Sequence, residues 1–195
     1  MSMKRFPCEQ YATLELNQVA FPKTGMVVSQ TPLGDAFTKD APCENGMWVV
    51  ADKAAGKINA PAAVTDTPIG IVYTAEKEYD IMHYGLKTFG RKIAGDYPRV
   101  GILGLGDTVT TNCLQYDDSE YAAVTTPGSE KTSDEVLYAA LENIGTTAMY
   151  VVPVAGSAVP KLTATKPGTG AYAKVVKFYT VPNGEKGVKY EMMRV

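Results

Sequence analysis

The sequence predicts a mainly β protein, a small β-sandwich or barrel with a β-rich C-terminal lobe and at most one or two short helices. Turn-forming residues are frequent, with 18 Gly and 12 Pro in 195 residues. They recur evenly, about 8–12 residues apart, as they do in sandwiches and barrels. The segments between them are short and rich in β-branched and aromatic residues, which favour strands. Only one segment carries a strong helix signal.

The central stretch, residues 45–73, contains Trp48, the only tryptophan. Residues 47–51 and 69–73 have the composition of strands. Three residues between them break any long helix: Gly56, Pro61 and Pro68. The pattern predicts strand, loop, short strand, loop, strand in a compact β unit. We expect Trp48 to be buried in the core of this unit, and the alternative is an outward-facing contact residue at an interface.

The flanking segments carry weaker signals. Residues 11–19 fit either a strand or a short helix, and residues 26–30 resemble a strand. Strands are expected at 99–105, at the Thr-rich run 108–116, and at the returning run 121–125.

Two of these segments share a short pattern, because one Gly interrupts a β-branched run in both 68–72 and 99–103. The match can mark equivalent strands in which Gly70 and Gly101 relieve crowding, or it can be chance.

Residues 126–133 combine Pro, Gly, Ser and charge, which predicts a linker between a main β domain at 1–126 and a C-terminal lobe at 127–195. Thr132 and Glu135 then fit a capping box. Five apolar residues share one helix face: Val136, Leu137, Ala140, Leu141 and Ile144. Gly145 stands where a C-terminal cap is expected. A strand is the alternative, since Val136, Leu137 and Tyr138 are also compatible with a sheet.

The last third reads as strands. Pro153 within residues 148–154 indicates an edge strand. Residues 172–181 and 188–193 are expected to pair as an antiparallel hairpin, with Asn183 and Gly184 in its loop.

Composition excludes several classes of partner. There are 19 Lys plus Arg and 21 Asp plus Glu, so the net charge of −2 gives no general attraction to nucleic acid or to an anionic membrane. No apolar run reaches the roughly 20 residues that cross a bilayer. The first ten residues do not form a secretory signal, and we expect synthesis in a host cytoplasm. Cys8, Cys43 and Cys113 are expected to be reduced thiols in or near the core.

Three candidate sites were weighed, and each is better explained as structure. His83 is the only histidine, and its neighbours supply neither a triad nor a metal site. The glycines between Gly101 and Gly106 do not fit a phosphate loop, because Asp107 stands where Lys is required. The acidic residues Asp117, Asp118 and Glu120 lack EF-hand spacing. The sequence therefore predicts no catalytic, cofactor-binding or metal-binding residues, no cofactor and no enzymatic activity.

Four segments share their pattern with a known family: 45–51, 68–72, 97–101 and 106–112. Over residues 40–116 the chain resembles the head decoration (cement) proteins of tailed bacteriophages. The resemblance implies a β-rich module without enzymatic activity that associates with itself on a capsid surface. The chain is longer than the smallest such proteins, which would end near Thr126, so the last third needs a role of its own.

We therefore expect a structural virion protein on the capsid surface that binds the major capsid protein, as a trimer or another closed homo-oligomer. Apolar patches and strand pairing rather than charge would carry this binding. Neither nucleic acid nor a membrane is an expected partner. The alternative is a carbohydrate- or receptor-binding module of a phage tail or cell surface, in which the 12 Tyr and one Trp stack on sugars.

Overall fold

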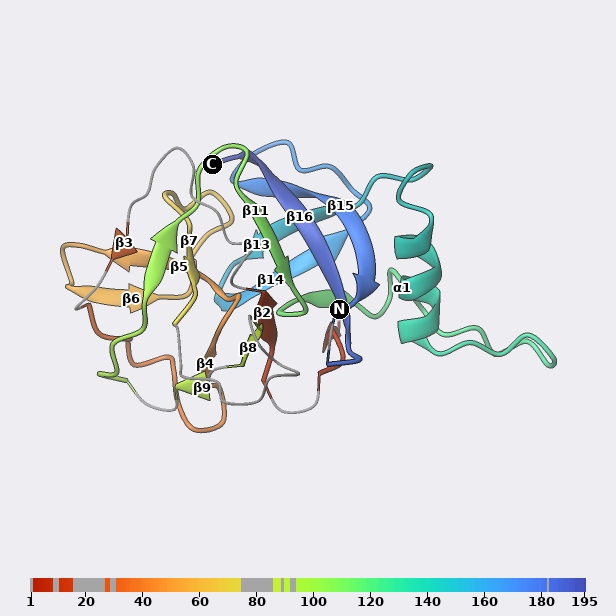
Figure 1. Ribbon diagram of the computed structural model, residues 1–195, viewed down its shortest axis with the longest axis horizontal. Helices are drawn as coiled ribbons and strands as arrows, with labels where there is room; N and C mark the ends of the chain where they lie inside the picture. The colour runs from red at the N-terminus through yellow and green to blue at the C-terminus, as the bar shows by residue number, and fades with distance from the viewer. Residues whose placement is uncertain are drawn as a thin grey trace.

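The fold is mainly β, as predicted from the sequence. A computed structural model describes residues 2–8, 11–15, 27–28, 31–74, 86–88, 90–91, 94–181 and 183–195. Among the described residues strands predominate, and one helix is present. In Figure 1 the smaller of the two large sheets lies on the left, the long C-terminal strands lie in the centre, and the labelled helix lies on the right.

The largest sheet has nine strands in the order β1-β12-β14-β13-β15-β16-β11-β2-β8. Its members are β1 (Met3–Arg5), β2 (Thr13–Glu15), β8 (Leu86–Thr88), β11 (Thr108–Thr111), β12 (Gln115–Asp117), β13 (Tyr150–Val154), β14 (Ser157–Thr163), β15 (Tyr172–Thr180) and β16 (Lys186–Arg194). Neighbouring strands are antiparallel except β12 and β14, which run parallel. The four strands that follow residue 126 lie together in this sheet between β12 and β11, which both precede it, so hydrogen bonds join the two expected units directly. The domain boundary itself stays a prediction.

The second sheet contains the central stretch of the sequence. Its order is β3-β10-β7-β5-β6. The members are β3 (Val27–Val28), β10 (Val100–Ile102), β7 (Gly70–Val72), β5 (Trp48–Asp52) and β6 (Lys57–Asn59). A two-stranded sheet pairs β4 (Cys43–Glu44) with β9 (Gly90–Arg91). The order strand, loop, short strand, loop, strand predicted for residues 45–73 is confirmed.

The two strands that share a glycine pattern are neighbours in this sheet. β7 and β10 pair antiparallel, with Gly70 opposite Ile102 and Gly101 opposite Ile71. A Cβ atom on Gly70 would lie 2.5 Å from Cγ1 of Val100, closer than side-chain carbons approach one another. Gly70 therefore relieves crowding, as one of the two interpretations predicted.

Trp48 joins the two large sheets. Alternate residues of β5 face opposite sides, so Trp48 enters the main core and Val49 enters a second apolar cluster. The Trp48 side chain is fully buried, its Nε1 donates to the hydroxyl of Tyr190 at 2.9 Å, and the two rings meet edge to face with centroids 5.9 Å apart. The structure places Trp48 in the core, as the first of the two alternatives predicted.

The helix and the terminal hairpin are also confirmed. α1 (Ser133–Glu142) begins with the complete Thr132–Glu135 capping box and buries Leu137 and Leu141. Its C-terminal cap is Asn143 rather than Gly145, because the Asn143 amide already donates to the carbonyl of Ala140. β15 and β16 pair antiparallel from Tyr172↔Arg194 to Thr180↔Lys186.

Three further local predictions were wrong. β13 is an interior strand and not an edge strand, since it lies between β14 and β15. Pro153 has no N–H, and an interior strand tolerates it because the ladder to β14 shifts register at this residue. The run 108–116 forms β11 and β12 instead of one strand, since the chain departs from the ladder at Asn112, whose side chain bonds elsewhere. In the run 121–125 the only pairing is an isolated bridge at Val124.

Candidate functional site

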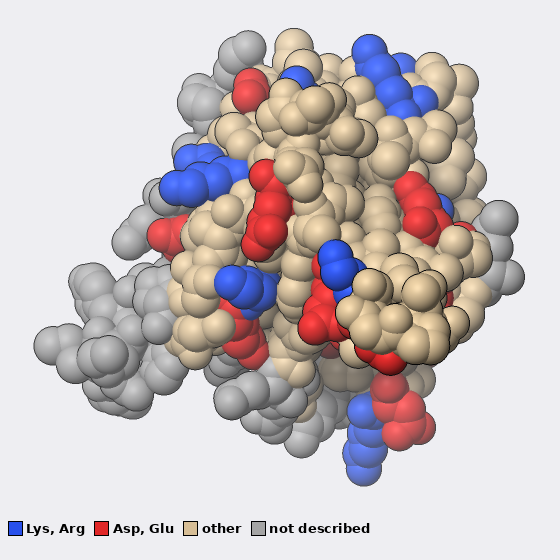
Figure 2. All heavy atoms as spheres, turned by 90° about the vertical axis from the view of Figure 1, so that its right-hand side faces the viewer, with Lys and Arg blue, Asp and Glu red and all other residues tan. Residues whose placement is uncertain are grey.

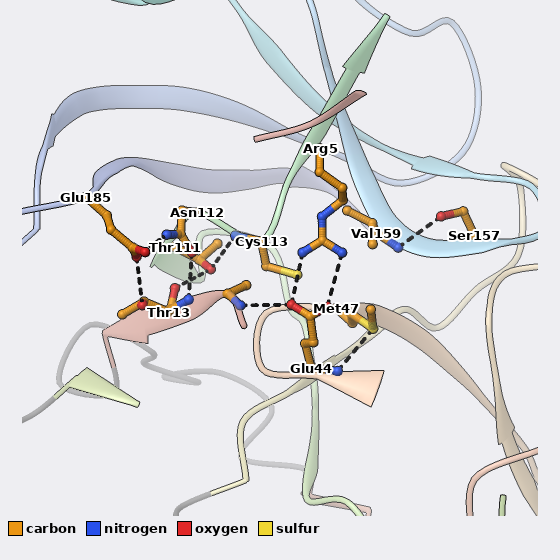
Figure 3. Close-up of polar contacts among 11 residues, drawn as sticks. Arg5, Thr13, Glu44, Met47, Thr111, Asn112, Cys113, Ser157, Val159 and Glu185 are labelled. Carbon is orange, nitrogen blue, oxygen red and sulfur yellow. Dashed lines mark hydrogen bonds and ion pairs between the residues drawn. The ribbon is translucent and has the colours of Figure 1, made fainter. Parts of the chain in front are cut away.

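A buried polar cluster lies between the N-terminal strand and the loop that enters β5 (Figure 3). Arg5 on β1 donates through Nη1 and Nη2 to Oε1 and Oε2 of Glu44 on β4, at 3.3 and 3.0 Å. The backbone amide of Ala12 also donates to Glu44 Oε2, at 2.8 Å. The Glu44 side chain is only 8% exposed, against 37% for Arg5. A buried carboxylate that accepts three hydrogen bonds has a structural role.

A second group of polar side chains lies beside it and ties β2 to the terminal hairpin (Figure 3). The Thr13 amide donates to Asn112 Oδ1 at 2.6 Å, and Asn112 Nδ2 donates to Glu185 Oε2 at 2.7 Å. The same Glu185 oxygen accepts from the Thr13 hydroxyl at 3.2 Å and from Asn183 Nδ2 at 3.0 Å. These bonds connect three segments that are far apart in the sequence.

The three cysteines are free thiols near this cluster. Cys43 and Cys113 are buried and Cys8 is half-buried. Burial raises the pKa of the Cys113 thiol, and the nearby Arg5 charge offsets only part of the effect. Burial likewise raises the pKa of Cys8, although Arg5 lowers it in part. Cysteine nucleophiles need a lowered pKa, so these two environments favour the unreactive thiol.

Two other candidates from the sequence, Asp107 and Asp117, hold turns. Asp107, buried after β10, accepts the Gly104 amide at 2.7 Å through Oδ2. Asp117 Oδ1 accepts the hydroxyl and the amide of Ser119, at 2.6 and 3.0 Å, and these bonds lower the pKa of Asp117. His83 lies outside the described residues. Within the described ranges, no group of three or more His, Cys, Asp or Glu residues is placed to hold a metal ion.

The most exposed feature is a hairpin at residues 122–132, called here the ribbon, which projects from the body beyond α1 (Figure 1). Val124 and Lys131 exchange backbone hydrogen bonds at 2.8 and 2.9 Å, and the Ser129 amide donates to the Thr126 carbonyl at 2.9 Å. Every residue of the ribbon is exposed. A two-stranded ribbon in water gains little stability from its own contacts.

Both ends of the ribbon are anchored. Before it, Tyr121 is 5% exposed and packs edge to face on Tyr116. After it, the capping box starts α1, and Asp134 in the first turn accepts bonds from Lys4 at 3.1 Å and from the Tyr116 hydroxyl at 2.5 Å. The anchors fix where the ribbon leaves the body.

A groove of about 550 Å³ lies beside β5 and β6. Its floor and walls are mostly small and apolar, with Val50, Ala60, Ala62, Pro68 and Ile102 among them. Charged residues on its lining are Asp52, Lys53 and Asp66. Among the described residues, no aromatic side chain lines this groove, so the part described offers no stacking surface of the kind that the carbohydrate hypothesis needs.

The surface at the α1 end shows no dominant charge. In Figure 2 basic and acidic residues are interspersed and separated by broad areas of other residues. This distribution agrees with the net charge of −2. In the described part of the chain, no helix has the length and apolar character to span a membrane.

Comparisons with known proteins found no match for this chain among family models, curated proteins or solved structures.

Sequence reasoning missed the Arg5–Glu44 pair and the Asn112–Glu185 bond. The first partners are 39 residues apart and the second 73 apart, and no motif links them. The local signals for these contacts were weak: Glu44 is a charged residue beside Cys43, and Asn112 lies within a Thr-rich run.

Proposed function

We propose that this chain is a non-enzymatic structural virion protein that binds and stabilises a bacteriophage capsid, as a decoration or cement protein. The observation that carries the proposal is the ribbon, in which eleven consecutive residues, 122–132, are exposed although both ends are anchored in the body. A projection of this kind adds almost nothing to the stability of its own chain. It is suited to contact with another protein.

The interior supports the same proposal. Carboxylates such as Glu44 and Glu185 are fully occupied in joining distant segments. Arg5 sits among thiols whose protonated form is favoured. Polar groups committed in this way stabilise a fold, and within this described cluster none of them is an acid, base or nucleophile poised for reaction. A protein that reinforces a shell needs this kind of stability.

The partner in this proposal is the major capsid protein, and the chain acts as a closed homo-oligomer, of which a trimer is the simplest form for a lattice with local threefold axes. The mixed surface charge supports attachment through apolar contacts and strand pairing instead of long-range attraction. The site of action is the outer capsid surface, after synthesis in the host cytoplasm.

The test is co-sedimentation with purified heads that lack this chain, from a deletion strain of the phage that encodes it. The purified protein should pellet with these heads in a saturable amount and should raise the temperature at which they open. Wild-type heads, with their sites already filled, are the matched control and should bind little. Failure to bind depleted heads, together with binding to immobilised host polysaccharide, would instead support the carbohydrate-binding alternative.

A further inference from the structure

The ribbon and the groove have matching size and chemistry. The ribbon sequence is AAVTTPGSEKT, in which Val124 is the largest apolar residue and Glu130 and Lys131 are the only charged residues. The groove walls are formed by side chains that are also small, including Ala60, Ala62 and Pro68. A volume of about 550 Å³ falls within the range of about 300–1,000 Å³ of typical ligand pockets, enough for a tight turn of small residues.

Their charges are complementary as well. Asp52 and Lys53 are adjacent on the lining of the groove, and Glu130 and Lys131 are adjacent on the ribbon. With the ribbon running antiparallel to this edge, Glu130 faces Lys53 and Lys131 faces Asp52. Neither Lys53 nor Glu130 forms an ion pair with another described residue.

The two features lie at opposite ends of the long axis of the molecule. Figure 1 places β5 and β6 at the left and the ribbon at the far right. The ribbon therefore cannot reach the groove of its own chain. A contact between different surfaces of two copies is heterologous, and repeating it produces either a closed ring or a filament.

We propose that the ribbon of one subunit seats in the groove of a second copy of this chain, and that repetition of this contact closes a ring. The turn of small residues enters the groove, and the Glu130–Lys53 pair fixes its orientation at the rim. This inference rests on the self-association that the proposed function includes. It does not depend on which surface the assembled ring binds.

The decisive experiment is disulfide cross-linking between two variants that each carry one added surface cysteine in a Cys8→Ser background, in which the remaining Cys43 and Cys113 are buried. Ser129→Cys labels the ribbon, and Ala62→Cys labels the groove. An equimolar mixture should form a cross-linked dimer on mild oxidation, whereas either variant alone should not. Cross-linking of each variant with itself, without enhancement in the mixture, would show a contact between like surfaces and overturn the proposal.

Charge exchange tests the orientation. Lys53→Glu and Glu130→Lys should each weaken association about tenfold or more, because each places like charges at the rim. The double variant should recover most of the affinity, and Lys174→Glu, on an exposed position of β15, should have no effect. Light scattering and sedimentation velocity measure association. A double variant weaker than both single variants would contradict the pairing.

Replacement of residues 123–131 by Gly-Ser-Gly separates this inference from the proposed function. The variant should keep the thermal melting temperature of the parent, because the ribbon is exposed along its whole length, and it should be monomeric. If this variant stays oligomeric, the ribbon does not form the contact between copies, and this conclusion holds whether or not the variant binds to heads. If the parent protein is itself monomeric at its highest soluble concentration, this inference fails, and head binding then decides the proposed function alone.

Discussion

Replacement of Trp48 tests whether the two sheets share one core. Trp48 is fully buried and its Nε1 donates to Tyr190 at 2.9 Å. Truncation of a buried Trp to Ala costs about 3–5 kcal/mol, and an unpaired buried hydroxyl on Tyr190 costs about 1–3 kcal/mol more. Trp48→Ala should therefore lose roughly 4–8 kcal/mol, comparable to the whole stability of an ordinary domain, about 5–15 kcal/mol.

Urea denaturation followed by far-ultraviolet circular dichroism measures the free energy of unfolding without relying on tryptophan emission. Because Trp48→Ala can fail to fold, Trp48→Phe provides a milder change that keeps a ring and removes the N–H donor. It should lose about 1–3 kcal/mol. Tyr97→Ala is the control, since Tyr97 is 57% exposed and its loss should change stability by no more than about 0.5 kcal/mol.

One result would refute the reasoning. If Trp48→Ala keeps the parent stability to within about 1 kcal/mol but no longer forms oligomers, Trp48 is an interface residue and not a core residue. The native protein should also show blue-shifted tryptophan emission that is poorly quenched by iodide, as a buried indole does.

Three further changes test particular contacts by denaturation or melting. Gly70→Ala should cost about 1–3 kcal/mol, because the added methyl meets a side chain of β10, whereas Gly145→Ala has open space and should be neutral; equal effects would contradict the packing. Glu44→Gln should cost about 1–3 kcal/mol because it weakens the three hydrogen bonds that the buried Glu44 carboxylate accepts. Asp35→Asn, in an ion pair that is open to solvent, should cost less than about 0.5 kcal/mol. Capping-box bonds lower the pKa of Glu135 below its ordinary value of 4.5, so its stabilising effect is complete above that pH and is lost as the pH falls below it. The difference in melting temperature between the parent and Glu135→Gln should therefore shrink as the pH falls below 4.5, and a constant difference from pH 7 to pH 3 would disprove the linkage.

The parts of the fold that sequence predicted are those whose signals are local. Asn183 and Gly184 mark the hairpin loop, and Thr132 with Glu135 marks the start of α1, because each motif acts within a few residues. The same is true of the three strands in residues 45–73, where turn residues separate short apolar runs.

The errors concern pairing across long distances. Pro153 indicated an edge strand, yet β13 lies inside the sheet because the register shift removes the need for its missing N–H. The Thr-rich run 108–116 gave no sign that Asn112 leaves the ladder to bond Thr13 and Glu185. For the same reason the Arg5–Glu44 pair was not foreseen. The ribbon was predicted only as a linker, since its composition indicates exposure and not the bridge between Val124 and Lys131.

If the proposed function is right, a phage encodes this chain, and the most direct test is quantitative mass spectrometry of the purified virions of that phage. The account predicts that the chain is present on intact heads in a fixed stoichiometric ratio to the major capsid protein, and that it is accessible to surface labelling. Absence of the chain from purified virions, or its presence only in tail fractions, would contradict the assignment to the capsid surface.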